Sequence, residues 1–268
     1  MVLTMLVSVG ICFIGLQVNQ RRQYNQRVTY AQTAIKTEKS ELENIGNKVD
    51  DLYLTDQKDF LNSETTTNDV SNLKTNLESI KVTGTDFNIK DSSLPPQAKE
   101  MAKLKEVISK QLIDASDKLQ LQEDTDKLFL DKLPNWQKST DDLLIKDDLS
   151  LEEISKTKEK LTFFEDDKWK ELADQYLSFA IEQVEKIQMI NKKIDEGAIS
   201  TYDDYLTLLD DIDSVKNEKN KTEFEKIAEK IAEDLGITQD ETSISSEEDY
   251  SNEELDSESD YQESDEYY

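Results

Sequence analysis

The chain has 268 residues, with 60 acidic and 32 basic side chains and a formal net charge of −28. It contains no histidine, one cysteine, six glycines and three prolines. This composition excludes histidine-based catalysis, histidine-ligated metals and intrachain disulfides, and it disfavours all-β folds, glycine-rich phosphate loops and nucleic-acid partners. We therefore expect an all-α, non-enzymatic protein with no catalytic, cofactor-binding or metal-binding residues, no cofactor and no small-molecule substrate.

Residues 1–18, MVLTMLVSVGICFIGLQV, carry no charged side chain. A helix of this length spans roughly 27 Å, close to the thickness of the hydrocarbon core of a bilayer. A cleaved signal peptide would begin with a basic residue and end in a small-x-small site, and a lipoprotein signal would not place Ile11 before Cys12. A soluble core helix would carry a polar face. The segment is therefore predicted to be an uncleaved transmembrane helix, with the lipid bilayer as its partner.

The orientation of this predicted anchor stays open at the level of sequence. Arg21, Arg22 and Arg27, the only arginines, follow it directly. The positive-inside rule would place the rest of the chain in the cytoplasm. The alternative is that an N-terminal cytoplasmic stretch was lost through a mis-assigned start; basic residues in that stretch would orient the helix the other way and place the rest of the chain outside.

A repeated helical pattern follows the predicted anchor. A Ser or Thr is followed three residues later by an acid and then by apolar residues at helical spacing, which predicts a capped short helix. A longer amphipathic segment precedes each short helix, so the unit is a helical hairpin used three times. The caps are Thr66 with Asp69, Ser150 with Glu153, and Thr201 with Asp204; the long segments are Ala31–Phe60, Ala98–Trp136 and Trp169–Ile194. A last helix is predicted from Thr222 to Leu235, and Gly197 is expected to cap the third long helix.

Two further stretches break the helical pattern. Residues 81–97 contain Gly84 and the Pro95–Pro96 pair and are predicted to connect hairpins, while Pro134 should end or kink the second long helix near Leu133. Residues 236–268 hold 13 acidic and no basic side chains, which predicts a disordered acidic tail. The expected organisation is an anchor over 1–18, a first hairpin over 19–81, a connector over 82–97, further hairpins over 98–235 and the tail over 236–268. We expect the hairpins to form an elongated antiparallel array.

Two groups of side chains are candidates for chemistry. Adjacent carboxylates suggest a metal site or a glycosidase dyad, but pairs are expected by chance in so acidic a chain, and solvated faces or caps are favoured. An aromatic glycan platform is the alternative to hydrophobic core for the aromatic residues, and core is favoured. The pairs are Asp147–Asp148, Asp166–Asp167, Asp203–Asp204 and Asp210–Asp211, and the aromatics are Trp136, Phe163, Phe164 and Trp169.

Residues 31–81 contain the phrases DDLYLTDQKDFL and NDVSNLKTNLESIK, separated by a threonine-capped turn. This stretch resembles the first extracellular domain of the mid-cell-anchored division protein (MapZ) family of streptococci and their relatives. The resemblance implies an outward-facing helical domain behind a single membrane helix. In that family a cytoplasmic segment contacts the division GTPase and a terminal domain binds peptidoglycan. This sequence shows neither part, so those two contacts are not carried over.

The function expected from the sequence is a single-pass membrane protein of a Gram-positive bacterium with a helical extracellular domain. It would act as a binding or scaffold module in the cell envelope or in cell division, with the cell wall or another envelope protein as the candidate partner. The alternative is a cytoplasmic, membrane-tethered helical regulator of the division ring, with the same architecture inverted.

Overall fold

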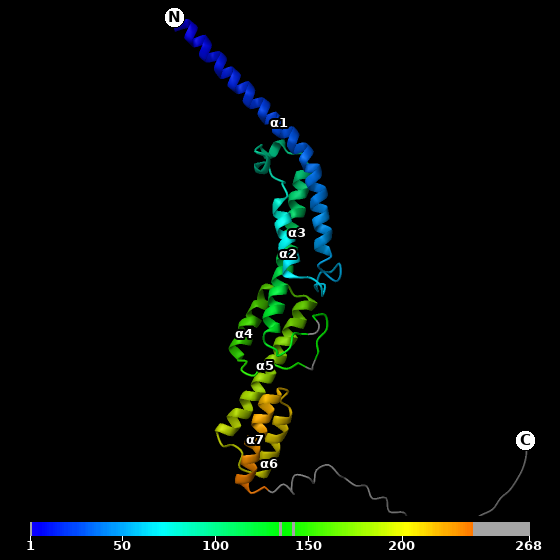
Figure 1. Cartoon of the computed structure of the whole chain (residues 1–268), viewed down its shortest axis with the longest axis vertical. Coiled ribbons are helices and arrows are strands. Elements are labelled where there is room, and N and C mark those ends of the chain that lie inside the picture. Colours follow the sequence, from blue (N-terminus) through cyan, green and yellow to red (C-terminus); the bar gives the residue numbers. More distant parts are fainter. Residues whose placement is uncertain (1, 134–135, 141–142, 238–268) are drawn as a thin grey trace, which may run out of the picture. The chain divides into compact units, whose positions relative to one another are not determined.

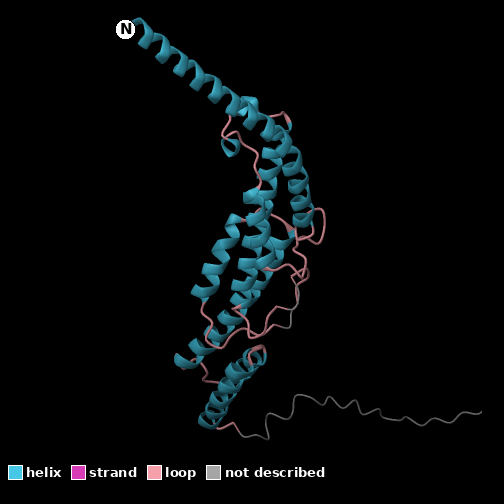
Figure 2. Ribbon diagram, turned by 45° about the horizontal axis from the view of Figure 1, so that its top comes forward, coloured by secondary structure: helices cyan, strands magenta, loops and turns pink. Residues whose placement is uncertain are grey.

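The computed structural model describes residues 2–133, 136–140 and 143–237, and side chains from Val18 onward. These residues form seven α-helices that pack as antiparallel pairs (Figures 1 and 2), which confirms the predicted all-α class. The helices are α1 (Val2–Asp50), α2 (Thr67–Ser79), α3 (Gln97–Asp126), α4 (Leu151–Lys160), α5 (Lys168–Asp195), α6 (Tyr202–Asp213) and α7 (Glu218–Leu235). Three short 3₁₀ helices are η1 (Thr85–Phe87), η2 (Asp91–Ser93) and η3 (Leu161–Phe163).

The chain divides into two compact units. The first comprises Met1–Met189 with Val215–Asn220, and the second comprises Ile190–Ser214 with Lys221–Tyr268. Residues 238–268 lie outside the described part, and they include nearly all of the predicted acidic tail. The predicted disorder of residues 236–268 therefore stays a prediction.

The short helices begin where the sequence predicted. Thr66, Ser150 and Thr201 each accept a hydrogen bond from the backbone of the residue three positions later, and the acid there accepts from the cap backbone in return. All three are full capping boxes. The reciprocal bonds satisfy amide groups that the first helical turn would otherwise leave unpaired.

The two long loops correct the sequence analysis. Helix α1 ends at Asp50, whereas the apolar pattern predicted helix as far as Phe60. Helix α3 ends at Asp126, whereas the predicted segment ran to Trp136 with an end or kink near Leu133. Instead, the segment after each helix turns back through a single antiparallel bridge. The bridge joins Tyr53 to Leu61 in the first loop and Phe129 to Ile145 in the second. The flanking hydrogen bonds repeat as well: Leu54 N to Phe60 O and Asn62 N to Leu52 O in the first loop, Leu130 N to Leu144 O and Lys146 N to Leu128 O in the second. The apolar residues of these loops therefore form an antiparallel bridge and do not extend the apolar face of the helix.

The third hairpin closes differently. Gly197, at φ +61°, follows α5, and the Gly197 and Ala198 amides donate to the carbonyls of Ile194 and Lys193 at 3.0 Å. These two bonds form a Schellman motif, which needs a residue in the left-handed region and so favours glycine. The predicted glycine cap is confirmed.

The first unit contains two apolar clusters along its helices. One gathers buried side chains of α1, α2 and the first half of α3, including Ile35, Leu42 and Ile108. The other gathers side chains of the second half of α3, the loop after it, α4 and α5, centred on Trp169 and Tyr176. Helix α3 therefore contributes to both clusters, which meet between Ala115 and Leu121.

The second unit buries a narrower apolar stripe. Tyr205, Leu208 and Ile212 of α6 are buried, as are Phe224 and Ala228 of α7. Leu208 is fully buried, as its central place in the predicted stripe requires. The spacing of these residues is that of one helix face.

The predicted connector over residues 82–97 is folded and packed. Phe87 is buried and its ring meets that of Tyr30 edge-on, with centroids 6.2 Å apart. A Cβ added to Gly84 would lie 2.6–2.8 Å from Asp91 and from the Ile89 carbonyl, so the tight turn admits only glycine without movement. The connector is therefore a fixed part of the first unit.

The predicted transmembrane segment lies almost wholly outside the residues whose side chains are described. Among the residues that the structure does describe, no helix is both long and apolar enough to cross a membrane. The anchor over residues 1–18 therefore stays a prediction.

Candidate functional site

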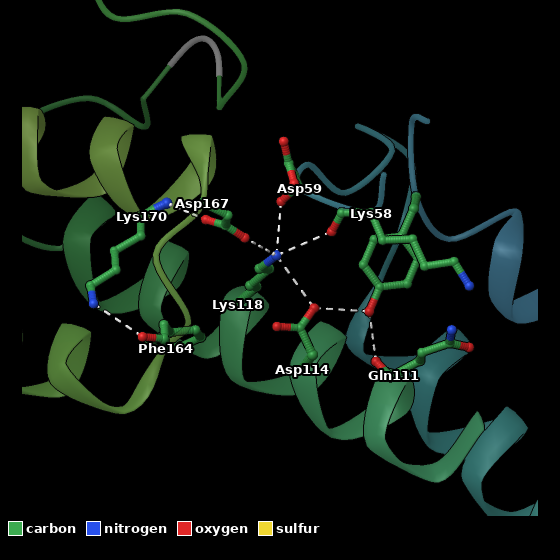
Figure 3. Close-up of polar contacts among 9 residues, drawn as sticks. Lys58, Asp59, Gln111, Asp114, Lys118, Phe164, Asp167 and Lys170 are labelled. Atoms are coloured by element: carbon green, nitrogen blue, oxygen red, sulfur yellow. Dashed lines mark hydrogen bonds and ion pairs between the residues drawn. The ribbon is translucent and has the colours of Figure 1, made fainter. Parts of the chain in front are cut away.

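A buried lysine lies where the two apolar clusters of the first unit meet. Figure 3 shows the polar contacts around it. Lys118, on α3, is 2 % exposed. Its ammonium group donates to the carbonyls of Lys58 at 3.2 Å and Asp59 at 2.8 Å, and to Asp167 Oδ2 at 3.0 Å. A second ion pair, with Asp114 Oδ2, measures 3.3 Å. One cation thus joins the first long loop, α3 and the start of α5.

The loop side of this site is closed by a tyrosine. Tyr53 Oη donates to the Gln111 carbonyl at 2.7 Å and to Asp114 Oδ2 at 2.9 Å. Burial raises the pKa of the Tyr53 hydroxyl well above its ordinary value, and the charge of Asp114 adds to that rise. Burial also raises the pKa of Asp114, although Lys118 opposes the effect. The hydroxyl is therefore a permanent donor at neutral pH, and it orients the carboxylate toward Lys118.

The α5 side of the site is held by a helix cap. Asp167 Oδ1 accepts from the Lys170 amide at 2.7 Å, which caps the first turn of α5, while Oδ2 accepts from Lys118. The Lys118 ammonium also lies 5.3 Å from the centroid of the fully buried Trp169 ring, within cation–π range. The helix start and the buried cation thus fix each other's position.

These contacts define what Lys118 can do. A lysine acts as a nucleophile or a base only when its amine is accessible, and this ammonium group is buried and enclosed by two carboxylates and two backbone carbonyls. The arrangement is therefore suited to fastening three chain segments together. A backbone of positive φ at Lys58 (60°) places its carbonyl at the ammonium, so the contact also holds a strained turn residue.

The second long loop is fastened by a neutral side chain. Asn217, 2 % exposed, donates from its amide nitrogen to the Ile145 carbonyl at 3.0 Å and to Asp147 Oδ1 at 2.8 Å. The neighbouring Lys216 amide donates to Gln183 Oε1 at 3.3 Å. An asparagine here does for the second loop what Lys118 does for the first.

A groove runs beside the two loops within the first unit. Its volume is about 1080 Å³, and it is lined by the first loop, the end of α3 and the second loop, including Leu61, Thr66, Gln122, Asp126, Leu130 and Trp136. Burial raises the pKa of Asp126, an effect opposed by the hydrogen bond from the Leu133 amide. Leu130, the residue after the bridge residue Phe129, is 51 % exposed, and Leu54, which follows Tyr53 in the first loop, is 48 % exposed. The lining mixes polar and apolar groups and points to no single ligand chemistry.

The acidic pairs identified in the sequence separate into individual structural contacts. Asp166 pairs with Lys170 at 2.7 Å, while Asp167 reaches Lys118. Asp204 forms the α6 cap, and the other pairs each supply one ion-paired member, Asp147 with Lys219 at 3.1 Å and Asp211 with Lys193 at 2.5 Å. No group of three or more metal-ligating side chains occurs among the described residues.

The candidate aromatic platform is mostly core. Trp136 stacks on Trp169 with centroids 6.2 Å apart, and Phe164 approaches Trp169 at 4.9 Å. Trp169 is fully buried, as the core interpretation predicted, whereas Phe163 is 88 % exposed and departs from it. Phe163 is the last residue of the short η3 helix, in which Leu161 is the buried residue.

Sequence reasoning missed Lys118 altogether. A signal for it exists, because Lys118 lies three residues after Ala115 and three before Leu121, both buried on the same face of α3. A cation in the middle of a buried stripe implies a buried partner. The remote partners, the carbonyls of the first loop, could not be located without the fold.

Comparison with known proteins gives no relative for this chain. No family model, no curated protein and no solved structure matches it significantly.

Proposed function

We propose that the chain is a non-enzymatic, single-pass membrane-anchored bacterial surface protein whose helical hairpins form a binding or scaffold module of the cell envelope or division machinery. Its partners in this proposal are the bilayer, through residues 1–18, and the cell wall or another envelope protein. The bulk of the chain lies outside the cell. The resemblance of residues 31–81 to the mid-cell-anchored division protein family supports this orientation.

One observation carries the proposal. Helix α1 runs without a break from Val2 to Asp50, and its side chains from Val18 to Tyr30 are exposed or half-buried, with the first buried one at Ala31. This exposed stretch is about 20 Å long at 1.5 Å per residue. The apolar segment therefore continues as one helix into the first core, with only the connector packed on the stretch between them, as expected of an anchor that leads into a domain outside the bilayer.

A second orientation is favoured by a specific feature. Arg21, Arg22 and Arg27 are exposed and directly follow the apolar segment. Basic residues beside a membrane helix favour the cytoplasmic side. In this alternative the same hairpins form a cytoplasmic, membrane-tethered regulator of the division ring.

Site-directed labelling separates the two orientations. Cys12 is the only cysteine, so the full chain carrying Cys12→Ser and Ser71→Cys presents one thiol at an exposed position of α2. A membrane-impermeant maleimide should label it in intact cells that produce the protein. Labelling that requires permeabilised cells would establish the cytoplasmic alternative, and Cys12→Ser alone gives the background.

Anchoring needs its own measurement. The full chain should remain in the membrane pellet after alkaline carbonate extraction. The double variant Leu6→Lys and Phe13→Lys should be released, because a charge at the centre of a membrane helix costs about 2.5–3.5 kcal/mol. Release of the unmodified chain would contradict the proposal in both orientations.

A further inference from the structure

The charges of this chain are segregated. All 60 acidic residues lie beyond residue 37, while the first 37 residues carry Arg21, Arg22, Arg27 and Lys36. A protein of net charge −28 is repelled by an anionic surface over most of its length. The segment next to the predicted anchor is the exception.

The three arginines surround α1. Each is exposed, in a stretch where Tyr24 and Val28 are the half-buried positions. At about 100° per residue, Arg21 and Arg27 lie roughly 60° to either side of Tyr24, and Arg22 lies on the opposite face. The positive charge therefore encircles the helix.

The folded connector adds a fourth cation beside Tyr24. Tyr24 Oη lies 2.8 Å from Ser93 Oγ and accepts from the Lys90 amide at 3.2 Å. The hydrogen bond with Ser93, then that from the Lys90 backbone, lowers the pKa of Tyr24, and the charges of Lys90 and Arg27 lower it further. Lys90 is exposed, so its charge joins those of the arginines.

The acids of the connector are occupied by its own backbone. Asp86 Oδ2 accepts from the amides of Val82 at 2.9 Å and Thr83 at 2.8 Å. Asp91 Oδ1 accepts from the Gly84 amide at 2.7 Å. Among the ion pairs of the described residues, none joins either carboxylate to Lys90 or to an arginine.

We propose that Arg21, Arg22, Arg27 and Lys90 form a basic collar that binds the headgroups of anionic phospholipids around the anchor. Arg21 lies about 5 Å beyond Val18 along the helix, within the headgroup layer, and Tyr24 lies about 9 Å beyond it. Arg27 and Lys90 are exposed, and their side chains are long enough to extend from that level to the headgroup layer. The collar holds the connector at the membrane surface while the acidic hairpins are repelled from it. This inference rests on the proposed anchor.

The test uses the full chain carrying Cys12→Ser and Ser92→Cys, with a donor fluorophore on the new thiol in the connector. The protein is reconstituted into vesicles of phosphatidylcholine, or of phosphatidylcholine with one quarter phosphatidylglycerol, each with the same trace of headgroup-labelled acceptor lipid. Energy transfer should be higher with phosphatidylglycerol at 0.05 M salt. It should fall to the phosphatidylcholine level at 0.5 M salt, because surface charge is then screened.

Matched variants assign the effect to the collar. Arg21→Gln, Arg22→Gln, Arg27→Gln and Lys90→Gln together should abolish the phosphatidylglycerol response, since each basic residue near an anionic membrane favours contact about fivefold. The control, Lys48→Gln, Lys74→Gln, Lys226→Gln and Lys230→Gln, removes the same charge from exposed positions elsewhere and should leave the response intact.

The outcomes distinguish this inference from the proposed function. Carbonate-resistant protein with equal transfer in both lipids, or a response lost equally in the control variant, would overturn the collar and leave the anchor standing. Protein that carbonate extracts from both kinds of vesicle would overturn the anchor, and the collar with it.

Discussion

The long loops of the first two hairpins and the short turn of the third solve the same problem differently. Each of the two loops makes one bridge and is then held by a buried polar side chain, Lys118 or Asn217. The third turn closes through its own backbone at Gly197. The buried polar side chains among the described residues, Lys118, Thr125, Thr157, Gln183 and Asn217, all lie in the first unit. Each long loop is thus held by a polar side chain from outside the loop, on α3 for the first and just before α7 for the second, whereas the tight turn is not.

The largest loss of stability is expected from replacing Lys118, the charged side chain that holds the first loop. Lys118→Met keeps the size of the stem but leaves Asp114 and Asp167 without their cation, so unfolding free energy should fall by about 3–5 kcal/mol. Urea unfolding of the full chain in mild detergent, followed by circular dichroism, measures this. The control is Lys110→Met, whose ammonium is exposed and pairs with Glu106, and which should change stability by under about 1 kcal/mol. Equal effects of the two variants would show that Lys118 is not a fastening.

The second unit should depend on apolar packing instead. Leu208, fully buried on α6, should lose about 2–5 kcal/mol on substitution by alanine. Leu206, on the same helix and 39 % exposed, is the matched control and should lose much less. The same unfolding measurement applies. A loss at Leu208 under about 0.5 kcal/mol would mean that α6 turns another face to its neighbour.

Replacing Asn217, the neutral side chain that holds the second loop, should lower stability less than replacing Lys118. Asn217→Ala removes the donors to the Ile145 carbonyl and to Asp147, with an expected loss of about 1–3 kcal/mol. No charge is left buried, because Asp147 keeps Lys219. A loss as large as that of Lys118→Met would remove the distinction between the two fastenings.

The smallest effects are expected at the helix caps. The hydroxyls of Thr66, Ser150 and Thr201 lower the pKa of Asp69, Glu153 and Asp204, respectively. A carboxyl whose folded pKa lies below its unfolded value stabilises above the unfolded pKa and loses that effect as pH falls through the folded pKa. Stability should therefore decline below about pH 4.5, and alanine at each hydroxyl should cost about 1 kcal/mol at neutral pH. Melting temperatures measured from pH 7 to pH 3 test this, and the alanine variants should lose part of the acid sensitivity. Unchanged sensitivity would assign the acid response to other carboxyls.

The sequence predicts the features of the fold that depend on residues close together along the chain. The caps at Thr66, Ser150 and Thr201 and the glycine at Gly197 depend on residues within one turn of each other, so their sequence pattern determines them. The ends of α1 and α3 were missed because LYL and LFL fit both a helix face and a bridge. The site at Lys118 was missed because its partners, Lys58, Asp59 and Asp167, lie 49 to 60 residues away along the chain.

Hydrogen exchange of the full chain and of Lys118→Met tests the central claim most directly, because the claim is that one cation fastens both sides of a junction. Loss of Lys118 should increase exchange in residues 53–61 and at the start of α5 together. Residues 202–213 of α6, which bury no polar group of this kind, should keep their protection. A change confined to one side of the junction, or spread equally to α6, would contradict the account.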